Sequence, residues 1–342
     1  MLEKIDLTKK LKKKEYKKRM PVLRDHLYAL QKASWDANVP VVILFEGWDA
    51  AGKGTSIQKL TARLDPRGFK LYPIRAARTY EKKHPWLWRF WLKIPGRGEW
   101  AIFDRSWYGR CLVERVENLI PEKEWRRAYR DIVDFERGLA DDGYLIVKFF
   151  LHISRDEQRQ RFESLSKDPL NAWHVAPEDW DHHRHYDDWA QAYEEAFERT
   201  DTEWAPWTIV EATDRRYTWL KIFQTLINRL EERLQALDAL PDPALWEPKG
   251  REGLDQEEAQ VSEGIPAGIP AVLPAEVPAD EPGLEEIEDT KQGEEVFETA
   301  PVSAIEPGEE EEGVEARPSP DGGAARATGP NEVEPASAEG AV

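Results

Sequence analysis

Residues 47–55 combine glycines and a lysine in an order that is typical of a phosphate-binding loop. Gly47 is followed, after four residues, by Gly52 and Lys53, which matches the spacing of that signature. Backbone amide groups of such a loop point at phosphate oxygens, and the lysine reaches the same anion. The alternative is a small-residue turn between a core strand and a helix. We name this segment the cradle and predict phosphate contacts from Gly47, Ala50, Ala51, Gly52, Gly54 and Thr55.

Two aspartates offer ligands for a metal ion beside the cradle. The residue after Lys53, where a Ser or Thr hydroxyl commonly binds Mg²⁺, is Gly54, so the ion needs another ligand. Asp49 is the candidate inside the cradle, because a hard cation prefers carboxylate oxygen. Asp104 follows the apolar run 100–103, and ligands of a doubly wound sheet lie beyond the carboxyl ends of its strands. We predict that Asp49 and Asp104 hold Mg²⁺ or, in its place, Mn²⁺.

Residues 104–110 read DRSWYGR and place two arginines close behind Asp104. An aspartate and two arginines in one turn supply a metal ligand and neutralise charge in phosphoryl transfer. The alternative is a helix-capping aspartate followed by surface arginines. Arg75, at the end of the apolar run 69–74, is a further candidate for phosphate binding. The predicted catalytic residues are Asp49, Lys53, Asp104, Arg105 and Arg110.

Apolar runs alternate with segments of helical periodicity along the first 240 residues. The predicted strands are 41–45, 69–74, 100–103, 145–151 and 207–212. Predicted helices include 21–37, a helix from 55 onward, 81–94, 122–143, 154–166, 181–200 and 217–237. The spacing of large apolar residues in 81–94 predicts packing in the core. Such alternation predicts an α/β fold with a parallel sheet covered by helices on both faces.

The segment 155–185 is predicted to be a lid. Its first helix holds Arg155, Arg159 and Arg161 within two turns, and a polar stretch with two prolines follows. A basic helix leading into a mobile segment suits closure over phosphate, whereas the alternative is an ordinary charged surface helix. Histidines at 182, 183 and 185 diverge on a helix, which argues against one zinc ion holding them all. We predict anion contacts or a solvated face for them.

Charge is divided unevenly along the chain. Residues 241–342 carry 27 acidic and 5 basic side chains, whereas the first 240 residues carry 39 acidic and 43 basic ones. The acidic part has so few large apolar side chains that burial cannot offset the entropy of ordering it, and we predict a disordered tail. Residues 9–19 hold eight bases and one acid. They form either a solvated helix face or a contact with a long polyanion.

Other features of the sequence bear on location. It has no run of 18 or more apolar residues, so we predict no membrane span. The basic N-terminus lacks the apolar core of an export signal. Cys111 is the single cysteine, which excludes an internal disulfide and suits a reducing cytoplasm. We expect Cys111 to be a small apolar filler.

Three segments together resemble the polyphosphate kinase 2 family. They are GWDAAGKG at 47–54, DRSWYGR at 104–110 and WAPWTIVEATD at 204–214, in family order. The resemblance covers roughly residues 5–235 and implies a P-loop kinase-like fold with a helical lid. It also implies transfer of the terminal phosphate of inorganic polyphosphate to a nucleotide with Mg²⁺. The closest branch converts AMP to ADP.

The resemblance implies roles for the residues of the cradle and the following turn. Asp49 and Asp104 would orient the metal and the phosphate, and Lys53 would hold the phosphate. Arg105 and Arg110 would neutralise developing charge.

The resemblance also extends to the nucleotide side and the lid. Glu114 is similar to the family's nucleotide-side acid, and Arg159 and Arg161 would belong to the lid. The chain departs from the family where Asn171 and His174 stand in place of lid Lys or Arg. His174 is largely uncharged at neutral pH, which weakens the expected grip on polyphosphate.

We therefore expect a polyphosphate-dependent nucleotide phosphotransferase with AMP as acceptor, or with ADP as the alternative acceptor. Two rivals stay open: an ATP-dependent nucleotide kinase and a non-catalytic polyphosphate-binding protein. Expected partners are polyphosphate, AMP or ADP and further copies of the chain, without nucleic acid or membrane. The expected organisation is a basic helical extension (1–38), a P-loop phosphotransferase domain (39–237) and the acidic tail (241–342).

Overall fold

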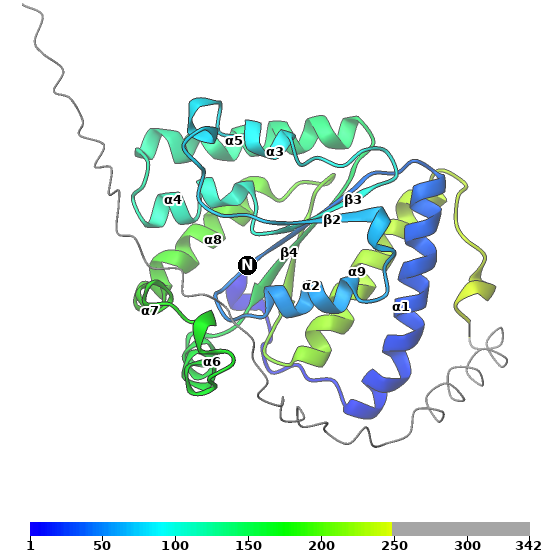
Figure 1. Cartoon of the computed structure of the whole chain (residues 1–342), viewed down its shortest axis with the longest axis horizontal. Coiled ribbons are helices and arrows are strands. Elements are labelled where there is room, and N and C mark those ends of the chain that lie inside the picture. The colour runs from blue at the N-terminus through cyan, green and yellow to red at the C-terminus, as the bar shows by residue number, and fades with distance from the viewer. Residues whose placement is uncertain (248–342) are drawn as a thin grey trace, which may run out of the picture. The chain divides into compact units, whose positions relative to one another are not determined.

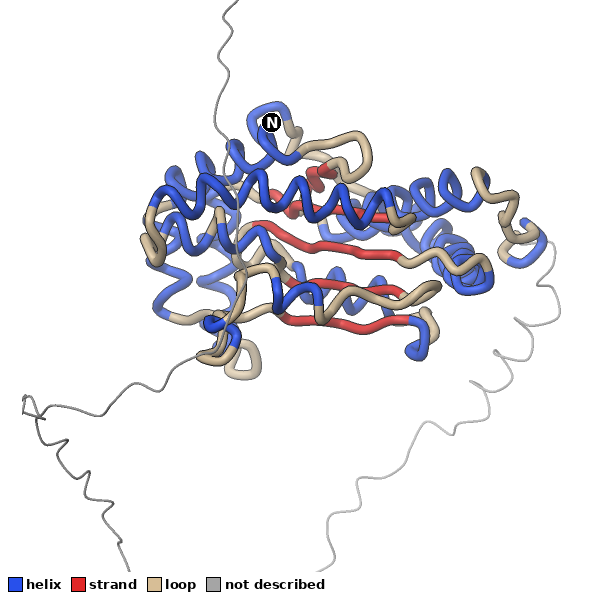
Figure 2. Tube along the Cα trace, turned by 90° about the horizontal axis from the view of Figure 1, so that it is seen from above, coloured by secondary structure: helices blue, strands red, loops and turns tan. Residues whose placement is uncertain are grey.

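The apolar runs form one parallel sheet in a computed structural model that describes residues 1–247. Residues 248–342 of the predicted tail lie outside the described residues. The strands are β1 (Val41–Gly47), β2 (Phe69–Pro73), β3 (Trp100–Asp104), β4 (Leu145–His152) and β5 (Trp207–Glu211). Their order is β2-β3-β1-β4-β5, and every neighbouring pair is parallel (Figure 2). The α/β prediction is confirmed.

Helices cover both faces of this sheet (Figure 1). On one face lie α1 (Lys13–Asp36), α2 (Lys53–Thr61) and α9 (Arg215–Gln235). On the other lie α3 (Trp88–Trp91), α4 (Val113–Val116), α5 (Glu122–Asp141) and α8 (Tyr186–Thr200). All residues of β1 and β4 are buried, as double coverage requires, and their near-continuous apolar sequences follow from it.

The lid prediction corresponds to two helices that lie beyond the edge of the sheet in Figure 1. They are α6 (Arg155–Lys167) and α7 (Pro177–Arg184). The Ser154 hydroxyl caps α6 by accepting a hydrogen bond from the Glu157 amide, which explains where this helix begins.

Three helix predictions were wrong in extent. The helix predicted at 21–37 begins at Lys13 and contains Pro21 in its interior. The predicted helix 81–94 contains only a short 3₁₀ turn and α3, and Trp91 is 52% exposed. Pro85 interrupts the segment, because a proline disfavours helical backbone in the preceding residue. The predicted helix 181–200 is two helices, α7 and α8, that meet at His185.

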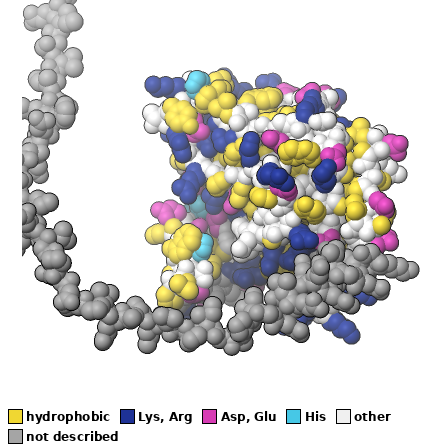
Figure 3. Space-filling model, turned by 45° about the vertical axis from the view of Figure 1, so that its right-hand side comes forward, with side chains coloured by type: hydrophobic (Ala, Val, Ile, Leu, Met, Phe, Trp, Pro, Cys, Tyr) yellow, Lys and Arg dark blue, Asp and Glu magenta, His cyan; other side chains and the backbone are white. Residues whose placement is uncertain are grey.

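The basic N-terminal region is part of the helical layer, since α1 packs along α9. Within 9–19, Lys9 pairs with Glu211 and Arg19 with Glu15, whereas most of the other basic side chains are exposed. On the face shown in Figure 3, Lys and Arg side chains are spread among acidic and hydrophobic ones. No helix within residues 1–247 is long and apolar enough to cross a membrane.

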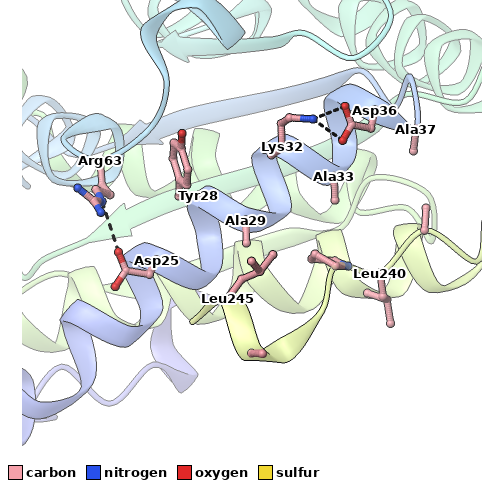
Figure 4. A pocket seen from close by; sticks show the side chains of 13 residues that line it. Asp25, Tyr28, Ala29, Lys32, Ala33, Asp36, Ala37, Arg63, Leu240 and Leu245 are labelled. Carbon is pink, nitrogen blue, oxygen red and sulfur yellow. Dashed lines mark hydrogen bonds and ion pairs between the residues drawn. The ribbon is translucent and has the colours of Figure 1, made fainter. Parts of the chain in front are cut away.

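A groove runs between α1 and the segment 239–245, which returns along that helix (Figure 4). Its lining includes Ala29, Ala33, Leu240 and Leu245, with Asp25 and Arg63 paired at one end. None of the predicted site residues lines it. The predicted site residues Asp49 and Asp104 lie instead near the carboxyl ends of β1 and β3.

Candidate active site

The cradle follows β1, the strand at which the order of strands along the sheet changes direction. From β1 the chain goes to β2 and β3 on one side and then to β4 and β5 on the other. Ligands of open α/β sheets bind in the crevice at such a point, beyond the carboxyl ends of the strands. Phe45 near the end of β1 pairs with Asp104 at the end of β3. The fold therefore brings the cradle and the turn 104–110 to one edge.

Two glycines shape the backbone of the cradle. Gly47 has φ +136°, and a Cβ there would lie 2.4 Å from the Leu151 carbonyl oxygen. Gly52 has φ +100° and caps α2, so that Lys53 is the first helical residue. Such backbone angles favour glycine, and amides at a helix N-terminus attract anions. The prediction of strand, loop and helix around the lysine is confirmed.

The remaining small residues keep the cradle open. Ala50 has φ +58°, an unusual angle of the kind found at functional sites. A Cβ at Gly54 would meet nothing within 4 Å. The Thr55 hydroxyl donates to the Gly52 carbonyl, and Ala51 is buried. Gly54 therefore has open space beside it at the start of α2, and phosphate binding by these residues stays a prediction.

Three charged side chains meet inside the cradle. Lys53 Nζ donates to the carbonyls of Gly47 (2.8 Å) and Trp48 (3.1 Å) and lies 3.8 Å from Asp49 Oδ1. Arg105 Nη2 donates to the same Asp49 oxygen at 2.8 Å. Two cations directed at one carboxylate can stabilise additional negative charge from a ligand.

Asp49 is held as a carboxylate. Burial raises its pKa, but the hydrogen bond from His182 and the charges of Lys53 and Arg105 lower it more, so the pKa lies well below its usual range. Burial lowers the pKa of Lys53, and Asp49 opposes that shift. The pair therefore offers a negative metal ligand next to a group that donates to phosphate.

A buried glutamate that the sequence analysis missed connects the cradle to the following turn. Glu46 is buried at the end of β1 and accepts a hydrogen bond from the Ser106 hydroxyl at 2.7 Å. Burial raises its pKa. The charge of Asp104 acts on both Glu46 and Lys53. Arg105, with φ +62°, directs its side chain to Asp49 in the cradle.

The predicted metal ligands fit a hard divalent ion. Asp49 and Asp104 both lie within electrostatic reach of Lys53, and each offers carboxylate oxygens, the donors that Mg²⁺ and Mn²⁺ prefer. Arg105 and His182 occupy the Asp49 oxygens in this structure. An ion bound there would take over one of those contacts. Mg²⁺ at these residues stays a prediction.

The turn 104–110 is supported by a buried ion pair. Lys148 and Glu136 are both fully buried, with 2.8 Å between Nζ and Oε2. Lys148 also donates to the Tyr108 hydroxyl and to the Thr200 carbonyl. Glu136 accepts from the Trp107 indole and from Tyr108. Because every partner is hydrogen-bonded, the pair fixes the two aromatic residues at the centre of the turn.

Arg110 is tied to carboxylates. It pairs with Glu114 and Glu124 and lies over the Trp86 ring. These pairs hold the predicted nucleotide-side acid Glu114 in place. Arg75 is exposed, and its carbonyl accepts a hydrogen bond from Arg89. The predicted roles of Arg110, Glu114 and Arg75 therefore stay predictions.

The two predicted lid arginines differ. Arg159 is 53% exposed and pairs with Asp156. Arg161 donates to four backbone carbonyls, which belong to Ala50, Ala51, Ala212 and Thr213. Arg161 therefore fastens the lid helix α6 to the cradle, because a buried guanidinium must satisfy its donors, and its predicted contact with phosphate stays a prediction.

The polar tip of the lid is loosely packed. The Asn171 amide donates to Asp168, and the His174 ring lies against the Trp173 ring with an interplanar angle of 30°. Leu170 is 82% exposed and Trp173 is 75% exposed. These two large apolar side chains therefore add little buried area to the folded chain.

His182 is a site residue that the sequence analysis assigned only to anion contacts or solvent. Its Nδ1 lies 3.0 Å from Asp49 Oδ2 and its Nε2 lies 2.8 Å from Glu117 Oε1. The predicted divergence of the histidines is confirmed, since His183 bonds Gln158 and His185 bonds the Asp181 carbonyl. The three-residue spacing of Asp179 and His182 was the available signal.

Trp48 is a second residue whose place the sequence did not indicate. Its indole donates to His152 Nδ1 at 2.9 Å and stacks on Tyr186 with ring centroids 3.8 Å apart. Burial lowers the pKa of His152 to about 4, so its Nδ1 stays an acceptor at neutral pH. Cys111 is buried, and burial raises the pKa of its thiol, which confirms the filler prediction.

Comparison with known proteins decides the family. The family model described as polyphosphate kinase 2 matches residues 10–237. The chain belongs to the polyphosphate kinase 2 family. A polyphosphate:AMP phosphotransferase of Pseudomonas syringae pv. tomato is 40% identical over 232 residues, which are 68% of this chain and 47% of the relative. An AMP/ADP-polyphosphate phosphotransferase of Meiothermus ruber is 37% identical over 215 residues, which are 63% of this chain and 78% of the relative.

Solved structures of this family share the fold. A polyphosphate kinase 2 of Pseudomonas aeruginosa PA01 has a TM-score of 0.67 at 40% identity, covering 68% of this chain and 50% of the other. One of Arthrobacter aurescens TC1 has a TM-score of 0.66 at 31% identity, covering 77% and 93%. The chain spans about half the length of the first polyphosphate:AMP phosphotransferases that it matches.

Proposed function

We propose that this polyphosphate kinase 2 family member transfers the terminal phosphate of inorganic polyphosphate to AMP and so forms ADP. The observation that carries the proposal is the meeting of Lys53, Arg105 and Asp49 in one glycine-rich cradle. The names of the relatives support the reaction, since three are polyphosphate:AMP phosphotransferases. Other relatives are named for ADP, and ADP is therefore the alternative acceptor.

The chemistry of the reaction explains these residues. A P–O bond at the end of polyphosphate breaks, a new P–O bond forms to an AMP phosphate oxygen, and polyphosphate leaves one unit shorter. The AMP phosphate is already ionised at neutral pH, so no strong general base is required. The main barrier is repulsion between two anions, which fixed cations in a low-dielectric site reduce.

The residues divide this work. Lys53 and Arg105 neutralise the phosphate at the cradle, and Arg110 acts on the charge that develops in transfer. Asp49 and Asp104 would hold Mg²⁺, which supplies further neutralisation of phosphate oxygens. Glu114 would face the nucleotide, while Arg75 and Arg159 would contact polyphosphate. We further propose that the protein is located in the cytoplasm and that its copies associate with one another.

One assay tests the proposal. The full chain is supplied with AMP and Mg²⁺ and with either polyphosphate or ATP as donor, and ADP formation from AMP is followed. ADP formation that requires polyphosphate is the expected result. Transfer from ATP alone would favour an ordinary nucleotide kinase. Polyphosphate binding without turnover would favour a non-catalytic role.

A further inference from the structure

Three potential metal ligands meet between the lid and the cradle. Ligand atoms of Asp49, Asp179 and His182 all lie within 4.8 Å of one another. Asp179 and His182 are three residues apart on α7, and this spacing places both side chains on one side of a helix. Asp49 approaches from the cradle. The cluster therefore joins two elements that are far apart in sequence.

A second observation points to a metal ion. The other ring nitrogen of His182, Nε2, lies 2.8 Å from Glu117 Oε1. Histidines that bind metals generally donate their second N–H to a carboxylate, which fixes the tautomer. Without a metal ion, Nδ1 donates to Asp49 Oδ2 at 3.0 Å, and a bound ion would replace this proton. The lone pairs of these two atoms require a proton or a cation between them.

The carboxylates of the cluster lead to the same requirement. Ligand atoms of the Asp49 and Asp179 carboxylates lie within 4.8 Å of each other, and Asp179 Oδ2 also accepts a hydrogen bond from the Ala176 amide. This like-charge contact would be relieved by a cation between the two carboxylates. Asp49 can contact the cradle and the lid at once, because its Oδ1 faces Arg105 at 2.8 Å and its Oδ2 faces His182.

We propose that Asp49, Asp179 and His182 bind a first-row divalent metal ion of the Mn²⁺ and Zn²⁺ class, with Glu117 orienting the histidine. An imidazole nitrogen among the donors favours such ions over Mg²⁺. This site differs from the predicted Mg²⁺ site by using α7 instead of Asp104. The inference goes beyond the proposed function, since it needs neither nucleotide nor polyphosphate.

The ion would fix the position of the lid. No side chain of α7 is buried, so apolar packing does little to hold this helix on the cradle. A bond from each of Asp179 and His182 to an ion on Asp49 supplies that attachment. Metal binding then favours the closed lid before substrate arrives.

The experiment uses the full chain with Mn²⁺ as the probe, without nucleotide or polyphosphate. Pulsed electron paramagnetic resonance detects a nitrogen atom bound to Mn²⁺, and titration gives the affinity. We expect nitrogen coupling in the unmodified chain. His182→Gln should abolish the coupling and weaken Mn²⁺ binding about tenfold or more. The matched control is His183→Gln, whose native side chain bonds Gln158, and it should retain both.

A second variant keeps the test independent of the histidine. Asp179→Asn should weaken Mn²⁺ binding about tenfold while nitrogen coupling persists, whereas Asp181→Asn on the same helix should bind as the unmodified chain does. Thermal melting establishes that each variant is folded. Absence of nitrogen coupling in the unmodified chain, its persistence in His182→Gln, or equal affinities throughout would overturn the proposal. A failed transfer assay leaves these readouts unaffected.

Discussion

The cradle and the lid are fixed in place by different means. The cradle follows a fully buried strand, and its course depends on glycine backbone angles at Gly47 and Gly52. The lid helices α6 and α7 bury only Gln158 and Phe162 between them. Side-chain bonds from Gln158, Arg161 and His182 attach them to the cradle. Backbone geometry thus sets the binding surface, and a few polar contacts set its cover.

The largest expected effect lies in the cradle. Lys53→Ala and Asp104→Asn should each reduce kcat/KM for ADP formation by about 10³-fold, because each removes fixed charge from the transferred phosphate. Lys59→Ala, on the same helix and placed over the Trp219 ring, is the control and should leave the rate nearly unchanged. Near-normal turnover in either cradle variant would remove the assignment.

The next effect concerns the support of the turn. Glu136→Leu leaves Lys148 as a buried charge without its carboxylate partner, and such a change costs about 3–5 kcal/mol of unfolding free energy. Denaturant unfolding measures it. The double variant Glu136→Leu with Lys148→Met should recover much of this loss, and equal stability of single and double variants would contradict the account.

A smaller effect distinguishes the two lid arginines. Arg161→Met removes donors from four carbonyls and should lower kcat about tenfold, as a misplaced lid would. Arg159→Met removes an exposed charge and should mainly raise KM for polyphosphate. Steady-state kinetics separates the two, and an identical pattern in both variants would mean that the comparison of anchored and exposed arginines is wrong.

A modest pH effect is expected from His152, which accepts a hydrogen bond from Trp48 of the cradle. Folded His152 has a pKa of about 4, below its ordinary value of 6.5, so the unfolded chain binds the proton first as pH falls. The unfolding free energy should therefore decrease between pH 6.5 and pH 4. His152→Gln cannot take up this proton, and its stability should depend less on pH across that interval. If the unfolding free energy depends on pH equally in both chains, His152 does not contribute to this pH dependence.

The smallest effect is expected from the acidic tail. Removing residues 248–342 should change the transfer rate less than about twofold, because a segment of this composition serves mainly as a solubilising appendage. Activity of the two chains at equal concentration measures this. A large increase would instead indicate that the tail restrains the site.

Local sequence predicted the cradle because its geometry is local. Glycine spacing, an apolar strand and the following helix occupy one continuous stretch, and the parallel alternation placed Asp104 beside it. The contacts of His182 with Asp49, 133 residues away, depend on how two elements pack. The carbonyl contacts of Arg161 could not be predicted for the same reason, because its sequence position shows a basic helix but not the carbonyls that face it. Local sequence motifs therefore identified the charged residues, whereas the partners of those residues depend on tertiary packing.

The close approach of Gly47 to β4 limits which residues natural sequences can carry at position 47. The Trp48 amide of the cradle donates to the Leu151 carbonyl, and four residues after Leu151 the lid helix α6 begins at Arg155. Any side chain at position 47 would displace Leu151 and with it the root of that helix. One substitution would thus disturb both the cradle and the start of α6. We therefore expect natural sequences to vary less at position 47 than a requirement for a small residue alone would allow.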